Sequence, residues 1–331
     1  MELRRETLTG EVVPPGSDRP APTSVEVRWD PLTGHAARLV QSPAGALVPP
    51  ADLDALARLA EETCATCPFC PARIEQVTPR FPPALWPAGR IRHGRALLFP
   101  NLLSYAQYAS VSVYAPELHA LRTAEFTPQL VADNLAAQVA FLRAVAAHEP
   151  AAGWASVNGN HLLPSGGSLF HPHLQGAAGP FPTTFQRLLA HLPAERFADY
   201  LATERRVGAR WLGSTGRVDW LAAFAPAGPA ELRALAAGAS LAALDEELTA
   251  ELGRGISAAL GLYAALGLES FNLAVYGLPP GHPLLVRLVG RQNPRPWYRS
   301  DVMYLERLHW ETAVDLTPEE VAERAGDRFA G

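Results

Sequence analysis

The chain has 331 residues, of which 48% are hydrophobic and 18% charged, with a formal net charge of −5 at pH 7. This composition is globular and excludes a disordered chain. The negative charge argues against a protein that wraps nucleic acid. No run of 18 apolar residues is present, and the first ten residues do not lead into a signal-peptide core. The sequence therefore predicts a soluble, cytoplasmic protein without a membrane segment.

The first half of the chain predicts strands on both sides of one long helix. Residues 24–40 read as a β-hairpin around the turn sequence DPLTG, and residues 95–100 and 109–116 read as strands. A helix is expected to begin at Thr127, with Pro128 at its first helical position, and to end before Pro150. Residues 154–160 predict a strand that leads, through a loop, to the sequence SLFHPHLQG at 168–176.

The same order begins again after about residue 180. Residues 218–226 predict a strand, residues 240–266 a helix, and residues 271–279 and 283–291 two strands around the turn PPGH. A last helix opens with Thr317 and Pro318, and Glu320 completes its capping box. The repeated order predicts an α+β fold with antiparallel sheets and an internal duplication, divided into residues 1–180 and 181–331.

All three cysteines, Cys64, Cys67 and Cys70, lie within seven residues. A disulfide scaffold would spread an even number of cysteines across the chain. The sequence CPFC can present two sulfurs to one tetrahedral metal ion, although a redox pair and inert thiols are alternatives. A zinc site needs two further ligands, and the ten histidines are their source.

Two histidines, His171 and His173, flank a proline in the motif at 168–176. Two residues apart on one strand, their side chains would share a face, so a metal ligand and a nucleophile could be neighbours. An isolated histidine is more often an ordinary surface or core residue. Four residues near this pair suit a phosphate, by close backbone approach or by hydrogen-bond donation. They are Gly166, Gly167, Ser168 and Gln175.

Five motifs occur in the same order as in the galactose-1-phosphate uridylyltransferases. They are DPLTG, CPFCP, a strand ending in APELH, an Asn followed by GGS and HPHLQ, and LTPEEVAER. The chain resembles this family over most of residues 25–325. The family is a branch of the histidine-triad superfamily, which also holds ADP-glucose and dinucleoside-polyphosphate phosphorylases. The resemblance implies two histidine-triad-like half-barrel units with flanking helices, and a homodimer whose active sites take residues from both subunits.

The resemblance also implies roles for individual residues. One structural zinc ion would be bound by Cys67, Cys70, His119 and His171, with Cys64 left over. His173 would attack the α-phosphorus of a nucleoside diphosphate sugar and carry the nucleotidyl group, for which a neutral imidazole is a good nucleophile. Three residues match positions that hold phosphate oxygens: Asn158, Ser168 and Gln175.

Two features depart from the family pattern. The basic segment that follows the first hairpin in the family is replaced here by QSPAGALVPP, which has no Arg or Lys. The family's second metal site needs a late His-x-His strand, but Val286 and Leu288 stand there and His282 is alone, so this second site is expected to be absent. Arg38 and Arg73 are candidates to replace the missing phosphate contact. Four late arginines would either replace it or form a solvated basic edge: Arg287, Arg291, Arg295 and Arg299.

The function predicted from these residues is nucleotidyl transfer through a covalent His173 intermediate. The donor would be a nucleoside diphosphate sugar, and the acceptor a sugar phosphate, another phosphorylated compound or inorganic phosphate. Two alternatives stay open. One is a hydrolase or phosphorylase that acts on nucleoside diphosphate sugars or dinucleoside polyphosphates. The other is a non-catalytic nucleotide-binding protein that has kept the site.

Overall fold

The structure is a computed structural model that describes residues 1–40, 48–295 and 302–330. The described residues form eight α-helices and 14 β-strands, and the strands make two sheets. All strand pairs are antiparallel except one. The predicted α+β class with antiparallel sheets is therefore confirmed.

The larger sheet has ten strands in the order β4-β5-β6-β8-β7-β12-β13-β11-β10-β9. Five come from the first half of the chain: β4 (Ile91–His93), β5 (Ala96–Pro100), β6 (Tyr108–Val113), β7 (Trp154–His161) and β8 (His173–Gly179). Five come from the second half: β9 (Trp211–Thr215), β10 (Val218–Ala222), β11 (Leu232–Ala236), β12 (Phe271–Tyr276) and β13 (Leu284–Gly290). Outward from the central β7–β12 pair, both halves have the same order of strands, as an internal duplication requires.

Most of the predicted strands of this sheet are confirmed. Those at 95–100, 109–116, 154–160, 218–226, 271–279 and 283–291 correspond to β5, β6, β7, β10, β12 and β13. The motif HPHLQG differs in one respect, because β8 begins at His173 and His171 precedes the strand. Pro172 between them has no N–H to donate to a ladder, which is a reason for the strand to start after it.

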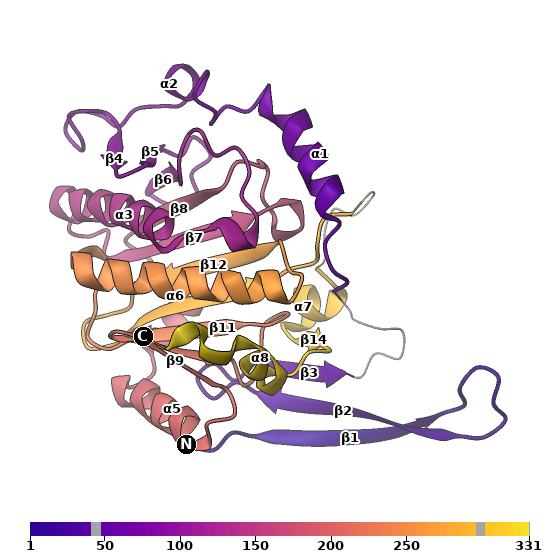
Figure 1. The fold of residues 1–331 in the computed structure, drawn as a ribbon. Helices are drawn as coiled ribbons and strands as arrows, with labels where there is room; N and C mark the ends of the chain where they lie inside the picture. The colour runs from indigo at the N-terminus through magenta and orange to yellow at the C-terminus, as the bar shows by residue number, and fades with distance from the viewer. Residues whose placement is uncertain (41–47, 296–301, 331) are drawn as a thin grey trace.

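Two long helices lie side by side across one face of the sheet (Figure 1): α3 (Pro128–His148) and α6 (Glu246–Ala265). α3 begins as predicted, with Thr127 as N-cap. α6 begins later than the predicted residue 240, because Asp245 caps it. By length and composition α3 is apolar enough to cross a membrane, but it packs in the main hydrophobic core with 61% of its most apolar stretch buried. It is a core helix.

The smaller sheet has the order β1-β2-β3-β14. Its strands are β1 (Arg5–Val12), β2 (Ala21–Trp29), β3 (Ala36–Val40) and β14 (Thr312–Val314). The β2–β3 hairpin is the predicted one, and the Asp30 carboxylate closes its turn by accepting from the Leu32 and Thr33 N–H groups. The sequence patterns do not predict β1, whose residues are all exposed on an arm that projects from the body (Figure 1).

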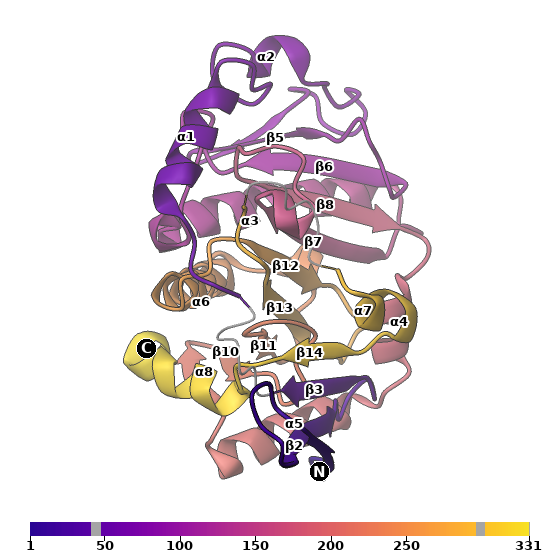
Figure 2. The same ribbon diagram turned by 90° about the vertical axis from the view of Figure 1, so that its right-hand side faces the viewer.

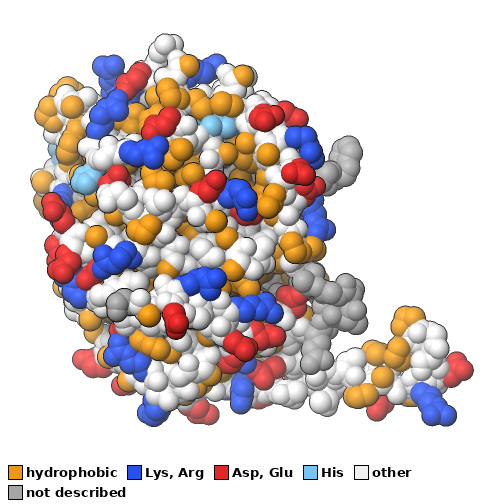
Figure 3. Space-filling model, in the orientation of Figure 1, with side chains coloured by type: hydrophobic (Ala, Val, Ile, Leu, Met, Phe, Trp, Pro, Cys, Tyr) orange, Lys and Arg blue, Asp and Glu red, His pale blue; other side chains and the backbone are white. Residues whose placement is uncertain are grey.

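The parallel β3–β14 pair attaches residues 5–40 to the C-terminal part of the chain. Ala37 and Leu39 of the hairpin pack with Phe224, Ala225 and Val314 of the second half. The division at residue 180 stays a prediction. Charged side chains of both signs are scattered over the face that carries α3 and α6 (Figure 3).

The other α-helices of the described residues are shorter than α3 and α6. They are α1 (Leu53–Cys64), α2 (Ile74–Val77), α4 (Thr184–Ala190), α5 (Ala194–Val207), α7 (Tyr304–His309) and α8 (Pro318–Ala325). The capping box of α8 forms as predicted between Thr317 and Glu320. Figure 2 shows α3 and α6 on one side of the sheet and α4 and α7 on the other. The predicted site residues lie on that second side or at its edge.

Candidate functional site

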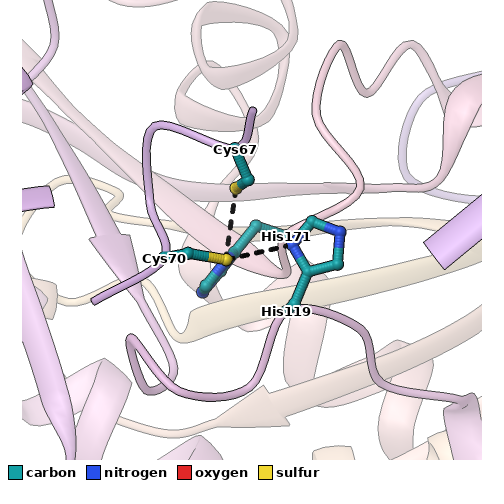
Figure 4. Close-up of side chains that lie close together, drawn as sticks. All are labelled: Cys67, Cys70, His119 and His171. Atoms are coloured by element: carbon teal, nitrogen blue, oxygen red, sulfur yellow. Dashed lines mark hydrogen bonds between the residues drawn. The ribbon is translucent and has the colours of Figure 1, made fainter. Parts of the chain in front are cut away.

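The four predicted zinc ligands converge (Figure 4). The ligand atoms of Cys67, Cys70, His119 and His171 all lie within 4.8 Å of one another. Nδ1 of His171 is 3.6 Å from Sγ of Cys67 and 3.8 Å from Sγ of Cys70. Nδ1 of His119 is 3.3 Å from Sγ of Cys70. Tetrahedral zinc, with bonds of about 2.1 Å to nitrogen and 2.3 Å to sulfur, places its ligand atoms roughly 3.3–3.8 Å apart. The three separations given above match such a metal ion, and the two sulfurs and two imidazoles are a ligand set that zinc prefers.

Hydrogen bonds on the far side of both imidazoles hold them in this orientation. Nε2 of His171 lies 3.1 Å from the carbonyl oxygen of Ala115, and Nε2 of His119 lies 3.0 Å from Oγ1 of Thr63. With Nε2 occupied, Nδ1 of each ring is directed at the sulfurs. Metal-binding histidines are usually fixed by outer partners of this kind.

The charge states of the cluster also suit a metal. Burial lowers the pKa of His171 to about 4, so the ring is neutral as a ligand must be. Burial, together with the Cys67 thiol, raises the pKa of Cys70 to about 12. Two adjacent thiolates therefore need a cation between them. Cys64 lies at the rim, exposed, with Sγ 4.0 Å from Sγ of Cys70.

Phe69 connects the cysteine loop to the second histidine of the motif. Its ring makes edge contacts with the rings of His171, His173 and Phe99, at centroid distances of 6.0, 5.5 and 5.3 Å. The cysteine loop, β5 and β6 share one small hydrophobic cluster, and the Phe69 ring extends it to His173. The position of His173 therefore depends on the fold of the cysteine loop.

His173 has the geometry of a nucleophile with a fixed tautomer. Its Nδ1 lies 2.8 Å from the carbonyl oxygen of His171, and because a carbonyl only accepts, Nδ1 carries the hydrogen. The lone pair is then on Nε2. Burial lowers the pKa of His173, so the ring is neutral at pH 7. Gln175 and Ala177 line a cleft, and alternation along β8 puts His173 on the same face of the strand as these two residues.

The cleft has a volume of about 1150 Å³ and extends over β7 and β8. Amide side chains dominate its polar lining: Asn101, Gln107, Asn158, Asn160, Gln175 and Gln186. The aromatic side chains are Tyr105, Trp154 and Phe181. None of the described residues that line it is charged. A concave site with aromatic rings and a few convergent polar groups is typical of a small-molecule site.

The amide of Gln175 presents its NH₂ group to the cleft. The backbone N–H of Leu103 donates to Oδ1 of Asn101 at 3.0 Å, and Nδ2 of Asn101 donates to Oε1 of Gln175 at 3.3 Å. Because a backbone N–H can only donate, it fixes the orientation of Asn101 and, through it, that of Gln175. Nε2 of Gln175 is left as a donor for a ligand.

The other two predicted phosphate contacts are less favourably placed. Nδ2 of Asn158 donates to Oγ of Ser156 at 3.0 Å and to the carbonyl oxygen of Gln175 at 3.4 Å. Asn158 therefore offers its oxygen, which suits a donor rather than a phosphate. Ser168 is exposed in the loop before β8. Phosphate binding by these two residues stays a prediction.

Asn160 is a cleft residue that the sequence reasoning missed. It lies two residues beyond Asn158 on the same face of β7, and its Oδ1 accepts a 2.7 Å hydrogen bond from Nδ2 of Asn272. Alternation along the strand was the available signal, since every second residue of VNGN faces the same way.

The six arginines considered for the missing phosphate contact lie in different places. Arg38 and Arg287 each form an ion pair with a glutamate. Arg291 donates to Oδ1 of Asn272 at 2.8 Å. Two are exposed, Arg73 and Arg295, and Arg299 lies outside the described residues.

The strand that carries the family's second metal site is built differently here. Val286 and Leu288 are buried in the main core. Nε2 of His282 lies 2.9 Å from the carbonyl oxygen of Leu192. The absence of a second metal site stays a prediction.

Proteins of known structure share the fold of this chain, although their sequences are distant. No family model matches the chain. An uncharacterized protein of Archaeoglobus fulgidus is 28% identical over 337 residues, which cover 98% of this chain and 97% of that protein. An ADP-glucose phosphorylase from Arabidopsis thaliana, solved with bound ADP-glucose, is 17% identical with a TM-score of 0.65 and covers 91% of this chain and 98% of its own. A uridylyltransferase structure is 20% identical with a TM-score of 0.59, and covers 92% and 98%. The chain therefore has the fold of the galactose-1-phosphate uridylyltransferase-like proteins, as its sequence resemblance implied.

Proposed function

We propose that the protein is a nucleotidyltransferase with a covalent His173 intermediate. It passes a nucleoside monophosphate group from a nucleoside diphosphate sugar to a phosphorylated acceptor or to inorganic phosphate. The observation that carries the proposal is the placement of His173. Its Nδ1 lies 2.8 Å from the carbonyl oxygen of His171, so the neutral ring keeps its lone pair on Nε2, and the ring is on the face of β8 from which Gln175 lines the amide-rich cleft.

The reaction consists of two displacements at the same phosphorus. In the first, the Nε2 lone pair forms a P–N bond with the α-phosphorus, the bond to the bridging oxygen breaks, and sugar 1-phosphate leaves. In the second, a phosphate oxygen of the acceptor attacks the same phosphorus and the P–N bond breaks. His173 regains its lone pair, so the cycle closes with ping-pong kinetics.

Amide donors lining the cleft would stabilise the charge that develops on the α-phosphate. Gln175 is two residues from His173 and directs Nε2 into the cleft, and Asn160 lies on the adjacent strand. Preorganised donors of this kind each contribute about 10²–10³ in rate. They are already oriented before the substrate arrives, which avoids reorganisation during the reaction.

The proposed zinc ligands are Cys67, Cys70, His119 and His171. When bound, the metal supplies a structural cross-link between the cysteine loop and the start of β8. His171 takes part through Nδ1 of its ring and also accepts from His173 through its carbonyl oxygen. This residue therefore connects the stability of the metal site to the orientation of the nucleophile.

A cytoplasmic homodimer forms part of the proposal. The loop beside the cleft exposes Leu102, Leu103 and Tyr105, which are 80%, 69% and 83% accessible in the single chain. A second subunit that covers this loop would bury apolar surface. It would also bring further side chains to a cleft whose described lining carries no charge.

The proposal is tested with donors labelled at the α-phosphate with ³²P. The protein is incubated with labelled UDP-glucose, UDP-galactose, ADP-glucose and GDP-mannose, and the label on the protein is tested for acid lability. Phosphorus NMR then follows product formation with sugar phosphates or phosphate. We expect an acid-labile adduct that an acceptor discharges. Release of nucleoside monophosphate at the same rate without an acceptor would instead identify a hydrolase, and no label from any donor would favour a non-catalytic protein.

A further inference from the structure

A chain of hydrogen bonds leads from the C-terminal half of the molecule to Asn160. Nη1 of Arg291, just after β13, donates to Oδ1 of Asn272 on β12 at 2.8 Å. Nδ2 of Asn272 donates to Oδ1 of Asn160 on β7 at 2.7 Å and to the carbonyl oxygen of Ser165 at 2.9 Å. The chain crosses the β7–β12 pair, the strand pair at which the two halves of the large sheet meet.

The direction of these hydrogen bonds follows from the chemistry of the two end groups. A guanidinium has only donors, so the atom of Asn272 next to Arg291 must be the oxygen. A backbone carbonyl only accepts, so the atom of Asn272 next to Ser165 must be the nitrogen. Both ends give the same orientation of the Asn272 amide. Asn160 consequently turns its oxygen to Asn272 and leaves its NH₂ group for the cleft.

We propose that Asn272 and Arg291 are positioning residues that keep Asn160 as a hydrogen-bond donor for a phosphate oxygen of the nucleotide. This inference rests on the proposed function. An amide side chain can rotate to offer either its oxygen or its nitrogen, and the wrong choice would set an acceptor against an anionic oxygen. The chain from Arg291 removes that freedom before the ligand binds. Residues of the C-terminal half thus determine whether the Asn160 amide on β7 donates or accepts in the cleft. β7 is the neighbour of β8, the strand that begins with His173.

The substitution Asn272→Asp tests the direction of the chain with almost no change in shape. The carboxylate still accepts from Arg291, but it also presents an oxygen to Asn160. Asn160 then has to donate its own NH₂ group to residue 272, which leaves its oxygen facing the cleft. We expect adduct formation on His173 to slow by about 10²-fold, the effect of losing one donor to the phosphoryl group.

A control variant measures how much stability is lost when a carboxylate replaces the hydrogen-bonded amide of an asparagine elsewhere in the protein. Asn293 accepts from the Glu269 N–H at 2.8 Å and donates to the carbonyl oxygens of Pro49 and Gly267 at 2.9 and 2.7 Å. Like Asn272, it accepts one hydrogen bond and donates two, but none of these hydrogen bonds goes to a residue that lines the cleft. Asn293→Asp is expected to lower the unfolding temperature while leaving adduct formation within twofold of the wild-type rate.

A double-mutant cycle separates positioning from a general structural effect. Asn160→Ala removes the group through which Asn272 is proposed to act, so Asn272→Asp should cause no further slowing in that background. Each variant is measured for single-turnover adduct formation, for the dissociation constants of UDP and ADP, and for unfolding temperature. Additive slowing in the double variant, or a wild-type rate in Asn272→Asp, would overturn the positioning role alone. A wild-type protein that forms no adduct would overturn the proposed function, and the positioning role with it.

Discussion

Nδ1 of His173 lies 2.8 Å from the carbonyl oxygen of His171. His171 therefore faces both parts of the site, with its ring against the sulfurs of Cys67 and Cys70 and its carbonyl against the neighbouring imidazole. Because only Pro172 separates His171 from His173, the metal site and the nucleophile cannot be positioned independently.

The first prediction concerns the nucleophile itself. His173→Ala should abolish donor cleavage, because no route to the covalent intermediate remains. His173→Gly should regain part of the activity when imidazole is added, since the small molecule can occupy the space of the missing ring. Quench-flow measurement of labelled protein and of released sugar phosphate checks both variants. Wild-type turnover by His173→Ala would exclude the mechanism.

A second prediction compares two asparagines on one strand. Asn160→Ala should slow adduct formation by about 10²-fold, because it removes a donor directed at the cleft. Asn158→Ala should slow it by less than about tenfold, because the NH₂ group of Asn158 is already used within the protein. Single-turnover rates under identical conditions decide the matter. If Asn158 proved the more important residue, the amide orientations inferred from the hydrogen bonds would be wrong.

Zinc content provides the third prediction. The purified protein should contain one zinc per chain by mass spectrometry of the metal. Cys67→Ser should lose the metal and unfold at a temperature lower by about 5 °C or more, because structural zinc contributes directly to folding. Cys64→Ser is the control, and it should keep the metal because its thiol lies at the rim of the cluster. Loss of zinc in the control would assign Cys64 to the ligand set.

The pH dependence of stability is a fourth prediction, and it concerns His161. Burial lowers the pKa of this histidine from 6.5 to about 4. Between these values the unfolded chain binds a proton that the folded chain does not, so the stability present above pH 6.5 decreases as the pH falls. The contribution of this one residue at pH 5 is a loss of about 2 kcal/mol.

His161→Gln isolates that contribution. Glutamine does not titrate, and its amide can still donate to the carbonyl oxygen of Leu121, which Nε2 of His161 approaches at 3.0 Å. Urea unfolding of both proteins at pH 5 and pH 7, in buffer containing zinc, gives the difference. Equal losses of stability in the two proteins would show that His161 is not responsible.

Assembly gives the last prediction. Light scattering at micromolar concentration should give twice the 35.5 kDa mass of the single chain. The double substitution of Leu102 and Leu103 by Ser should shift the mass toward that of a monomer, since the exposed loop is proposed to be covered by the second subunit. A monomeric wild-type protein would contradict the proposal.

The parts of the fold that neighbouring residues determine could be predicted from the sequence. The starts of α3 and α8 each have a capping Thr followed directly by a Pro, so the sequence predicts both helix starts. β1 was not predictable in this way, because its exposed residues carry no hydrophobic alternation and it is held by pairing with β2. The pairing of β3 with β14 joins residues 275 positions apart, such as Ala37 and Thr312, and short-range patterns hold no information on it.

The same distinction applies to the site. His171 and His173 stand in a motif, and the convergence of Cys67, Cys70, His119 and His171 agrees with the ligand set that the resemblance implied. The role of Asn160 depends on Asn272, whose neighbourhood to β7 arises only when the two halves of the sheet join. Alternation along the strand could have indicated Asn160, but its hydrogen bond to Asn272 can be identified only from the fold.

The β7–β12 pair has a consequence for the synthesis of the protein. β7 leaves the ribosome long before Val275 and the rest of β12, its partner across the middle of the sheet. At roughly 5–20 residues per second, the edge of β7 waits about 6–24 s for that partner. During that time its unpaired N–H and C=O groups can pair with another nascent chain. Ribosomes close together on one message would therefore favour strand-exchanged products, and slower initiation should improve the yield of correctly folded protein.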